Sequence, residues 1–340
     1  MTKKRATIKD VAAEAGVSYQ TVSRVINNKP DVTDTTRQRV LAAIEVLNFH
    51  PNLAARSLPR RRSHVIGLII PYDTDYLVRD PHLLAQLSGI DTEAHLRDYN
   101  VLLSTAGDSD SGLGAYQRFI QNQVADGALV IETAISQAGS ELLAQRDYAY
   151  VTLGYDLENP QAYFVHSDDR TGAKKATLHL LERGHRRIGL INGPPTGAIT
   201  AMEERLIGHQ RVLAEAGLSF DPELMGYGDY TRLSGQLATE KLLALPDPPT
   251  AIFALNDRMA MGAIRALHAA NLRVPHDVAV VGFDDTATAA DFSPALTTVR
   301  QPSKQIGQAA TQMLFKLISG ESVPDRQVLL PAELVVRQSS

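Results

Sequence analysis

The chain has 340 residues, of which 44% are hydrophobic, so it is long enough for two or three domains with substantial cores. It contains no cysteine, which excludes disulfides and thiolate metal sites, and we find no run of about 18 apolar residues that would cross a membrane. The net charge of -4 conceals an asymmetry typical of nucleic-acid binding, because residues 1–62 carry 12 Lys and Arg against 5 Asp and Glu, whereas the remainder carries 22 against 33.

The first expected helix covers Ile8–Ala15. Thr7 is a candidate N-cap with Asp10 three residues on, and the apolar residues of the segment recur at the spacing of one helix face. Gly16 can end the helix, because glycine readily takes the left-handed conformation found at helix C-termini. The segment therefore predicts a short amphipathic helix followed directly by a tight turn.

Two further helices would complete a small bundle. Ser18 can cap a helix from Tyr19 to about Asn27, whose apolar residues face inward. A third helix is expected from a cap near Thr33, and its inward-facing residues would be Val40, Leu41, Ile44 and Leu47. Helix, tight turn and helix together predict an all-α helix-turn-helix DNA-binding headpiece in residues 1-50.

The outward side chains of the second helix suit the major groove of DNA. Arg24 can pair with guanine and Gln20 with adenine through two hydrogen bonds each, and a good pair supplies roughly 1–3 kcal/mol of base discrimination. The alternative is an ordinary solvated face, which any amphipathic helix shows. The expected DNA contacts in the headpiece are Thr7, Ser18, Tyr19, Gln20, Thr21, Ser23, Arg24 and Asn27.

A short segment, Pro51–Leu58, follows the headpiece. It could form about two helical turns between Pro51 and Pro59, well below the roughly 12–15 residues at which isolated helices become marginally stable. We therefore expect residues 51-62 to form a hinge helix and linker that order only against a partner.

From Ser63 onward, short apolar strands alternate with amphipathic helices. His64–Ile70 is a continuous apolar run, as expected for a strand that is buried on both faces of a parallel sheet. The other expected strands are 101–104, 127–131, 149–153, 187–191, one near Met225, 251–254, 278–283, 297–300 and two within 327–337. The expected helices are 83–97, 116–122, 171–183, 201–216, 233–243, 258–270 and 302–319. Repeated β-α-β units predict an α/β core of two doubly wound subdomains.

The chain is expected to cross between these subdomains near its end. We expect an effector-binding and dimerisation core in residues 63-340, with an N-subdomain of about 63-164 and 296-323 and a C-subdomain of about 165-295 and 324-340. Open α/β sheets bind ligands at the carboxyl ends of their strands, so two facing subdomains would hold a small molecule in the cleft between them.

Polar residues near the strand ends are candidates for this cleft. Asn256 follows one expected strand and Asp284 another, although such residues are as often helix caps, and a cap and a cleft-facing neighbour can coexist. Arg205 lies on a helix, where a solvated side chain is the ordinary alternative. Tyr230 opens a helix and could simply be half-buried.

Two motifs identify a family resemblance. The sequence DVAxxAGVSxxTVSRVIN from Asp10 to Asn27, the segment PNLAARSL and the order of strands and helices behind them resemble the LacI/GalR (lactose-repressor) family of bacterial transcription regulators along essentially the whole chain. The resemblance implies a periplasmic-binding-protein-like core, a homodimer, a palindromic double-stranded DNA operator and a small-molecule effector.

The resemblance also implies roles for single residues. It assigns base reading to Tyr19, Gln20 and Arg24. It makes Leu58 a wedge in the minor groove, where such wedges kink the duplex, and the hinge residues carried over as DNA contacts are Asn52, Ala55 and Leu58.

The resemblance likewise implies roles in the cleft. Arg205 matches an effector-clamping arginine, and Asn256 and Asp284 match hydroxyl-binding positions. The remaining candidates are Tyr230 as a sugar-stacking ring, Gln301 at a crossover, and Asp73 and Tyr76 in the loop Pro71–His82, which departs from the common family pattern. An arginine, a carboxylate, amides and an aromatic face suit a sugar.

We find no P-loop, no HExxH, no GxSxG and no cluster of the ten histidines, so we expect neither an enzyme, nor a cofactor, nor a metal site. No apolar segment of a signal peptide follows the basic N-terminus, which favours a cytoplasmic, nucleoid-associated protein without membrane contact. The sequence therefore predicts a DNA-binding repressor whose operator affinity is set by a small effector, most simply a sugar. A purine corepressor remains the main alternative, followed by a solute-binding protein.

Overall fold

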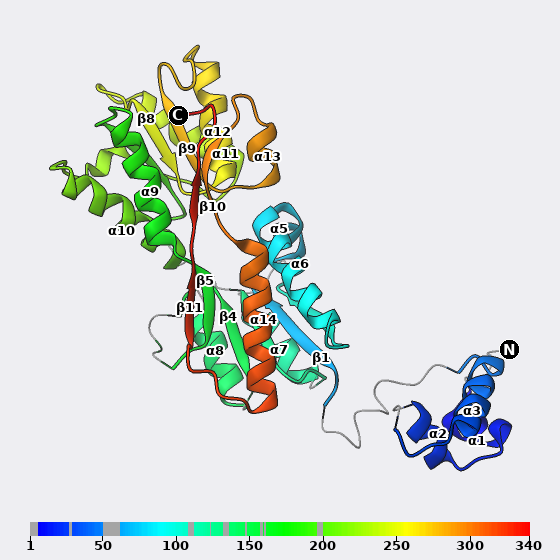
Figure 1. The fold of residues 1–340 in the computed structure, drawn as a ribbon. Helices are drawn as coiled ribbons and strands as arrows, with labels where there is room; N and C mark the ends of the chain where they lie inside the picture. Colours follow the sequence, from blue (N-terminus) through cyan, green and yellow to red (C-terminus); the bar gives the residue numbers. More distant parts are fainter. Residues whose placement is uncertain are drawn as a thin grey trace. The chain divides into compact units, whose positions relative to one another are not determined.

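The structure is a computed structural model that describes residues 6–26, 29–49, 62–107, 112–122, 124–131, 136–146, 148–156, 159, 161–195 and 200–340. The chain forms two compact units, Met1–His64 and Val65–Ser340, which are drawn in Figure 1. Nearly all of the expected hinge at 51-62 lies outside the described residues. Within the described part of the chain, no helix has both the length and the apolar character needed to cross a membrane.

The first unit contains the three expected helices, α1 (Ile8–Ala15), α2 (Tyr19–Ile26) and α3 (Asp34–Val46). Thr7 caps α1 in a capping box, in which the Thr7 backbone N–H donates to Asp10 Oδ2 at 2.7 Å. Gly16 ends α1 with φ 61°, a left-handed conformation that favours glycine. The turn then leads to Ser18, whose Oγ accepts from the Thr21 N–H at 3.2 Å and so caps α2.

The apolar faces of these helices enclose a small core. Val11, Val22 and Val40 are fully buried at its centre. The expectation for Leu41 was wrong, because its side chain is 52% exposed and lies one helical step away from the buried stripe of α3. Phe49, just beyond α3, is buried against the core and supplies apolar volume there.

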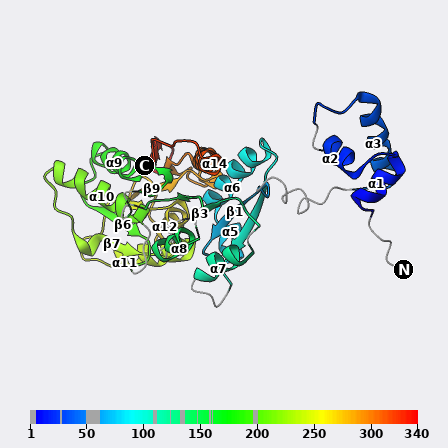
Figure 2. The same ribbon diagram turned by 90° about the horizontal axis from the view of Figure 1, so that it is seen from below.

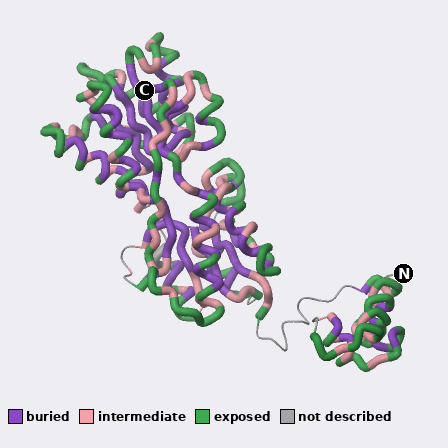
Figure 3. Tube along the Cα trace, in the orientation of Figure 1, coloured by how far each residue is buried: buried purple, intermediate pink, exposed green. Residues whose placement is uncertain are grey.

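The second unit contains two six-stranded sheets, each of which defines a subdomain. The first sheet has the strand order β11-β5-β4-β3-β1-β2, and all its neighbouring strands are parallel. Its strands are β1 (Val65–Ile70), β2 (Asn100–Thr105), β3 (Ala128–Ile131), β4 (Tyr150–Leu153), β5 (Phe164–Ser167) and β11 (Gln327–Leu330). Burial is concentrated on the central strands β1, β3, β4 and β5 (Figure 3), and β1 is the apolar run expected from the sequence.

Helices cover both faces of the first sheet (Figure 2). One face carries α6 (Pro81–His95) and α14 (Ser303–Ser319), which pack on each other, and the other carries α7 (Leu113–Asn122) and α8 (Ser136–Ala144). A short helix, α5 (Thr74–Arg79), precedes α6 in a segment where the sequence predicted only a loop.

The second sheet repeats this arrangement with the strand order β12-β10-β9-β8-β6-β7. Its strands are β6 (Ile188–Asn192), β7 (Met225–Tyr227), β8 (Ala251–Ala254), β9 (Ala279–Asp284), β10 (Thr297–Arg300) and the antiparallel β12 (Glu333–Val335). The helices are α9 (Asp169–Glu182) and α10 (Thr200–Glu215) on one face, α11 (Arg232–Leu243) and α12 (Asp257–Ala269) on the other, and the short η1 (Pro222–Leu224) and α13 (Ala287–Asp291).

The expected subdomain boundaries differ from the sheets at three strands. β5 and β11 belong to the first sheet, although the boundaries at 165 and 324 place nearly all of β5 and the whole of β11 in the C-subdomain. β10 belongs to the second sheet, although the boundary at 296 places it in the N-subdomain. Strands pair through hydrogen bonds between backbone groups, which are the same for every residue. The side chains of a short apolar strand beside a crossover therefore do not indicate which of the two sheets it joins. The chain consequently crosses between the subdomains after β5, β10 and β11 (Figure 1).

A buried histidine in the second subdomain leads to a prediction about pH. The pKa of His209, which is fully buried, falls from 6.5 to about 4 because burial disfavours the imidazolium. A lowered pKa means that stability is complete above pH 6.5 and is lost as the pH falls toward 4. We therefore expect the wild type to lose about 2 kcal/mol more unfolding free energy than His209→Leu when the pH falls from 7 to 5.

Urea unfolding of the wild type and His209→Leu at these two pH values measures this effect. The ring packs near Phe220 and Phe253, so leucine suits its surroundings. Identical pH dependence in the two proteins would show that His209 does not titrate in this range.

Candidate effector pocket and nucleic-acid interface

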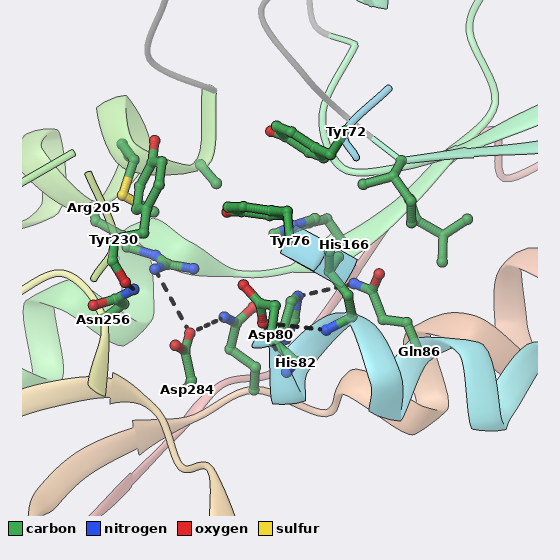
Figure 4. Close-up of a pocket in the computed structure, with 16 residues that line it drawn as sticks. Tyr72, Tyr76, Asp80, His82, Gln86, His166, Arg205, Tyr230, Asn256 and Asp284 are labelled. Carbon is green, nitrogen blue, oxygen red and sulfur yellow. Dashed lines mark hydrogen bonds and ion pairs between the residues drawn. The ribbon is translucent and has the colours of Figure 1, made fainter. Parts of the chain in front are cut away.

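A pocket lies between the two subdomains, at the edge where the carboxyl ends of their strands meet (Figure 4). Ile131 and Leu153 end strands of the first sheet there, and Asp284 ends a strand of the second. The sixteen lining residues are Tyr72, Tyr76, Asp80, His82, Leu83, Gln86, Ile131, Leu153, His166, Ala201, Met202, Arg205, Tyr230, Asn256, Asp284 and Gln301. The pocket thus occupies the position at which open α/β sheets bind small molecules.

Six of the seven candidate effector residues line this pocket, namely Tyr76, Arg205, Tyr230, Asn256, Asp284 and Gln301. Asp73 does not line the pocket, contrary to the prediction. Its carboxylate accepts from the Tyr76 N–H at 2.6 Å and caps α5, so it serves the local backbone and is exposed.

Arg205 is held rigidly in the wall of the pocket and is only 3% exposed. Its Nε donates to Asp169 Oδ1 at 2.7 Å, and one terminal nitrogen donates to the Leu255 carbonyl at 2.5 Å. The guanidinium also lies over the Phe283 ring, 3.7 Å from its centroid. These contacts fix the plane of the guanidinium, which is the requirement for directed hydrogen bonding to a ligand.

The pKa values of the two carboxyl groups beside Arg205 are shifted in opposite directions. Burial alone would raise the pKa of Asp169, but Arg205 and His166 outweigh it and hold this pKa below its usual range. Burial raises the pKa of Asp284 well above its ordinary value. Arg205, whose nearest nitrogen is 3.9 Å from Asp284 Oδ1, lowers this pKa but offsets the effect of burial only in part. Gln301 donates to Asp284 Oδ1 at 2.7 Å. A ligand that donates hydrogen bonds to Asp284 would therefore favour its charged form.

Asn256 combines the two roles that its sequence position allowed. Its Oδ1 accepts from the Met259 N–H at 2.8 Å and caps α12, while its side chain lines the pocket. Its Nδ2 donates to the Tyr230 carbonyl at 3.2 Å and so holds the backbone of that residue, which has φ 67°. Tyr230 precedes α11, whose N-cap is Thr231, and therefore does not open the helix itself.

Aromatic rings form another part of the pocket. Tyr72 and Tyr76 stack with their centroids 4.4 Å apart, and Tyr230 lies on the side of Arg205 and Asn256 (Figure 4). Rings of this kind can lie against the C–H face of a sugar or against a planar heterocycle. In the described part of the chain, no group of three or more His, Cys, Asp or Glu residues could hold a metal ion.

In the first unit, the exposed face of α2 carries the candidate base-reading residues. Tyr19 is 55% exposed and Gln20 is exposed beside it. Arg24 forms an ion pair of 3.3 Å with Asp31, but both side chains are more than half exposed, so the pair contributes little. Thr21 and Ser23 are half-buried, Thr7 and Ser18 act as helix caps, and Asn27, Asn52, Ala55 and Leu58 lie outside the described residues.

Comparison with known proteins decides the family. Residues 7–52 match the family of bacterial regulatory proteins of the lacI type, and residues 177–340 match the periplasmic binding protein-like domain. The transcriptional regulator CelR of Thermobifida fusca is 36% identical over 99% of both chains, and the transcriptional repressor PurR of Aliivibrio salmonicida is 34% identical over 98% of both. This chain belongs to the LacI family. It is a DNA-binding transcription regulator controlled by an effector.

Solved structures of LacI-family proteins agree with this fold. A complex of CelR with cellobiose matches with a TM-score of 0.77 and 35% identity, covering 99% of this chain and 100% of that one. A Lac repressor dimer bound to operator and an anti-inducer matches with a TM-score of 0.89 and 29% identity over 99% of both chains. The predicted resemblance and fold class are confirmed, and these relatives are regulators, not enzymes.

The LacI-family resemblance did not supply every pocket residue. Tyr72, Asp80, His82, Gln86 and His166 also line the pocket, and the first four lie in or beside the segment that departs from the family pattern. A local signal was present, because Asp80 before Pro81 is a strong helix start, and Asp80 Oδ1 accepts from the His82 N–H at 3.0 Å. A helix from Pro81 places His82 and Gln86 on one face at a spacing of four residues.

An ion pair at the rim of the pocket joins the subdomains and leads to a second prediction. Arg258 of α12 donates to Asp80 Oδ2 at 2.9 Å, and the two side chains are 16% and 15% exposed. Arg258 also donates to the Arg79 carbonyl at 3.3 Å. We expect Arg258→Ala to destabilise the core by about 1–3 kcal/mol and to speed amide exchange in α5 and the start of α6.

Hydrogen exchange resolved by mass spectrometry measures this change. The matched control is Arg273→Ala, because the pair of Arg273 with Asp277 is exposed and within one local segment. Equal exchange in α5 in both variants would show that Arg258 does not hold this segment.

Proposed function

We propose that the protein is a homodimeric, cytoplasmic repressor that binds a palindromic operator and is regulated by a sugar. The observation that carries the sugar assignment is the arrangement of Arg205, Asn256 and Asp284 beside the Tyr230 ring. Adjacent sugar hydroxyls need paired donors and acceptors, and the C–H face needs an aromatic ring. The similarity to a regulator that was solved with cellobiose supports the same class of effector.

Regulation would act through movement of the two subdomains against each other. The pocket is lined from both, and three chain crossings connect them, so a ligand that contacts both sides favours one arrangement over others. By its sequence, Pro51–Leu58 is too short to be a stable helix alone. Its order–disorder equilibrium on DNA could therefore respond to small displacements in the core of a dimer.

A dimer would present two headpieces to the two halves of a palindrome. The similarity to a Lac repressor dimer on its operator supports this assembly. The core also exposes Leu233 and Leu237 on α11, at 64% and 49%, beside a groove that contains Met261 and Phe292. Such apolar surface suits burial against a second copy. A tetramer in light scattering at moderate concentration would contradict the dimer.

One experiment tests the regulated activity and the effector class together. Fluorescence anisotropy measures binding of the full-length protein to a palindromic operator found by footprinting, with and without glucose, galactose, cellobiose, lactose, maltose, guanine and hypoxanthine. We expect at least one sugar to change operator affinity. A response only to the purines would replace the sugar by a purine corepressor, and protection of no palindromic site would overturn the proposed operator.

A further inference from the structure

One buried side chain in the pocket has an unused hydrogen-bonding atom. Gln86 of α6 is 2% exposed and lines the pocket from the first subdomain, on the opposite side from Arg205, Tyr230 and Asn256 (Figure 4). Its amide nitrogen lies 2.9 Å from His82 Nε2. Its amide oxygen is buried, and no hydrogen-bond partner for it exists among the described residues. A buried acceptor without a partner is costly, so this atom needs an explanation.

The neighbouring hydrogen bonds determine which amide atom is left over. Burial lowers the pKa of His82 to about 4, so the ring is neutral at neutral pH and carries one N–H. His82 Nδ1 lies 2.8 Å from Ser303 Oγ, which can itself donate to the Gln301 carbonyl at 3.4 Å. When Nδ1 donates to Ser303, Nε2 must accept from Gln86, which leaves the amide oxygen of Gln86 free.

The other neutral tautomer of His82, with the proton on Nε2, also leaves one amide atom of Gln86 without a partner. If His82 donates through Nε2, the Gln86 amide turns over and its nitrogen is left without a partner instead. A hydroxyl can donate to the oxygen or accept from the nitrogen, so it satisfies either arrangement. The chemistry thus indicates a ligand hydroxyl at this side of the pocket.

We propose that Gln86, oriented by His82, determines effector specificity by binding one hydroxyl of the sugar from the first subdomain. This inference rests on the proposed sugar effector. The same molecule would be held by Arg205, Asn256 and Asp284 from the second subdomain, so a sugar without the hydroxyl at Gln86 leaves a buried polar atom unpaired. Such a sugar should be rejected even when its other end fits.

Calorimetric titration of the full-length protein tests this proposal. The tightest-binding sugar of the panel above is titrated together with its series of single-deoxy derivatives. We expect one deoxy derivative to bind the wild type roughly 5- to 100-fold more weakly than the parent sugar because of the unpaired amide atom. Gln86→Leu should bind the parent sugar with a similar loss and should no longer distinguish it from that one derivative.

Controls separate this role from a structural one. Gln86→Leu should still distinguish the parent sugar from the derivatives that lack a hydroxyl at the other positions. A general loosening of the pocket would instead weaken this discrimination at every position. Gln117→Leu, on an exposed position of α7, should behave as the wild type. Gln86→Met provides a second replacement of similar length if the leucine variant folds poorly.

The possible failures are distinguishable. If no sugar binds the wild type, the sugar effector is wrong and this inference fails with it. If a sugar binds and Gln86→Leu and Gln86→Met retain the full deoxy profile of the wild type, the sugar effector stands and the role of Gln86 is wrong.

Discussion

Replacing Arg205 by alanine is expected to abolish the effector response and to destabilise the core by about 3–5 kcal/mol. Arg205 is the cation whose Nε contacts Asp169, a carboxylate with no exposed surface and a pKa below its usual range. Without the guanidinium, this carboxylate must stay charged in a buried site or take up a proton. The variant also leaves the Leu255 carbonyl without its donor.

Thermal and urea unfolding of the purified protein measure the destabilisation, and operator binding with the sugar panel measures the response. Arg211→Ala is the matched control, because it removes the same side chain from the same helix. The Arg211 pair with Glu215 is exposed, so the expected loss is below about 0.5 kcal/mol. Equal stability of the two variants would mean that Arg205 does not support Asp169.

Replacing Arg24 by alanine is expected to weaken operator binding by roughly 1–3 kcal/mol and to relax preference at one base position. The exposed guanidinium is free to exchange its weak pair with Asp31 for two hydrogen bonds to a guanine. Binding to every single-base variant of the operator, measured for wild type and Arg24→Ala at one fixed salt concentration, gives the affected position.

Asp31→Asn is the control for the Arg24 experiment. It leaves Arg24 in place and removes a negative charge near DNA, so affinity should be equal or higher for all sequences alike. A uniform loss in Arg24→Ala, the same for every operator variant, would show that Arg24 contacts only phosphate.

The headpiece could be predicted from sequence because its signals are local. Thr7 with Asp10, Gly16, and Ser18 before α2 each specify a helix end within a few residues, and each forms the predicted cap. Leu41 shows the limit, since a short helix with a narrow buried stripe leaves one of two adjacent apolar residues exposed.

The pocket could be predicted only where a family pattern supplied distances between remote residues. Nothing local relates Arg205 on α10 to Asp284 at the end of β9, yet both line one pocket. In the segment Pro71–His82, where the chain departs from that pattern, the resemblance does not indicate which side chains face the cleft. The predicted set therefore includes Asp73 and omits Asp80 and Gln86, although the helix start at Asp80 and Pro81 is a local signal for α6 and its inward face.

The late return of the chain to its first sheet has a consequence for protein synthesis. Phe164 of β5 pairs with Gln327 of β11, so the edge of that sheet remains unpaired until the ribosome has made almost the entire polypeptide. An open strand edge on a nascent chain is a template for aggregation. A fragment that stops just before Gln327 should therefore accumulate in inclusion bodies, even though it contains all sixteen residues that line the pocket.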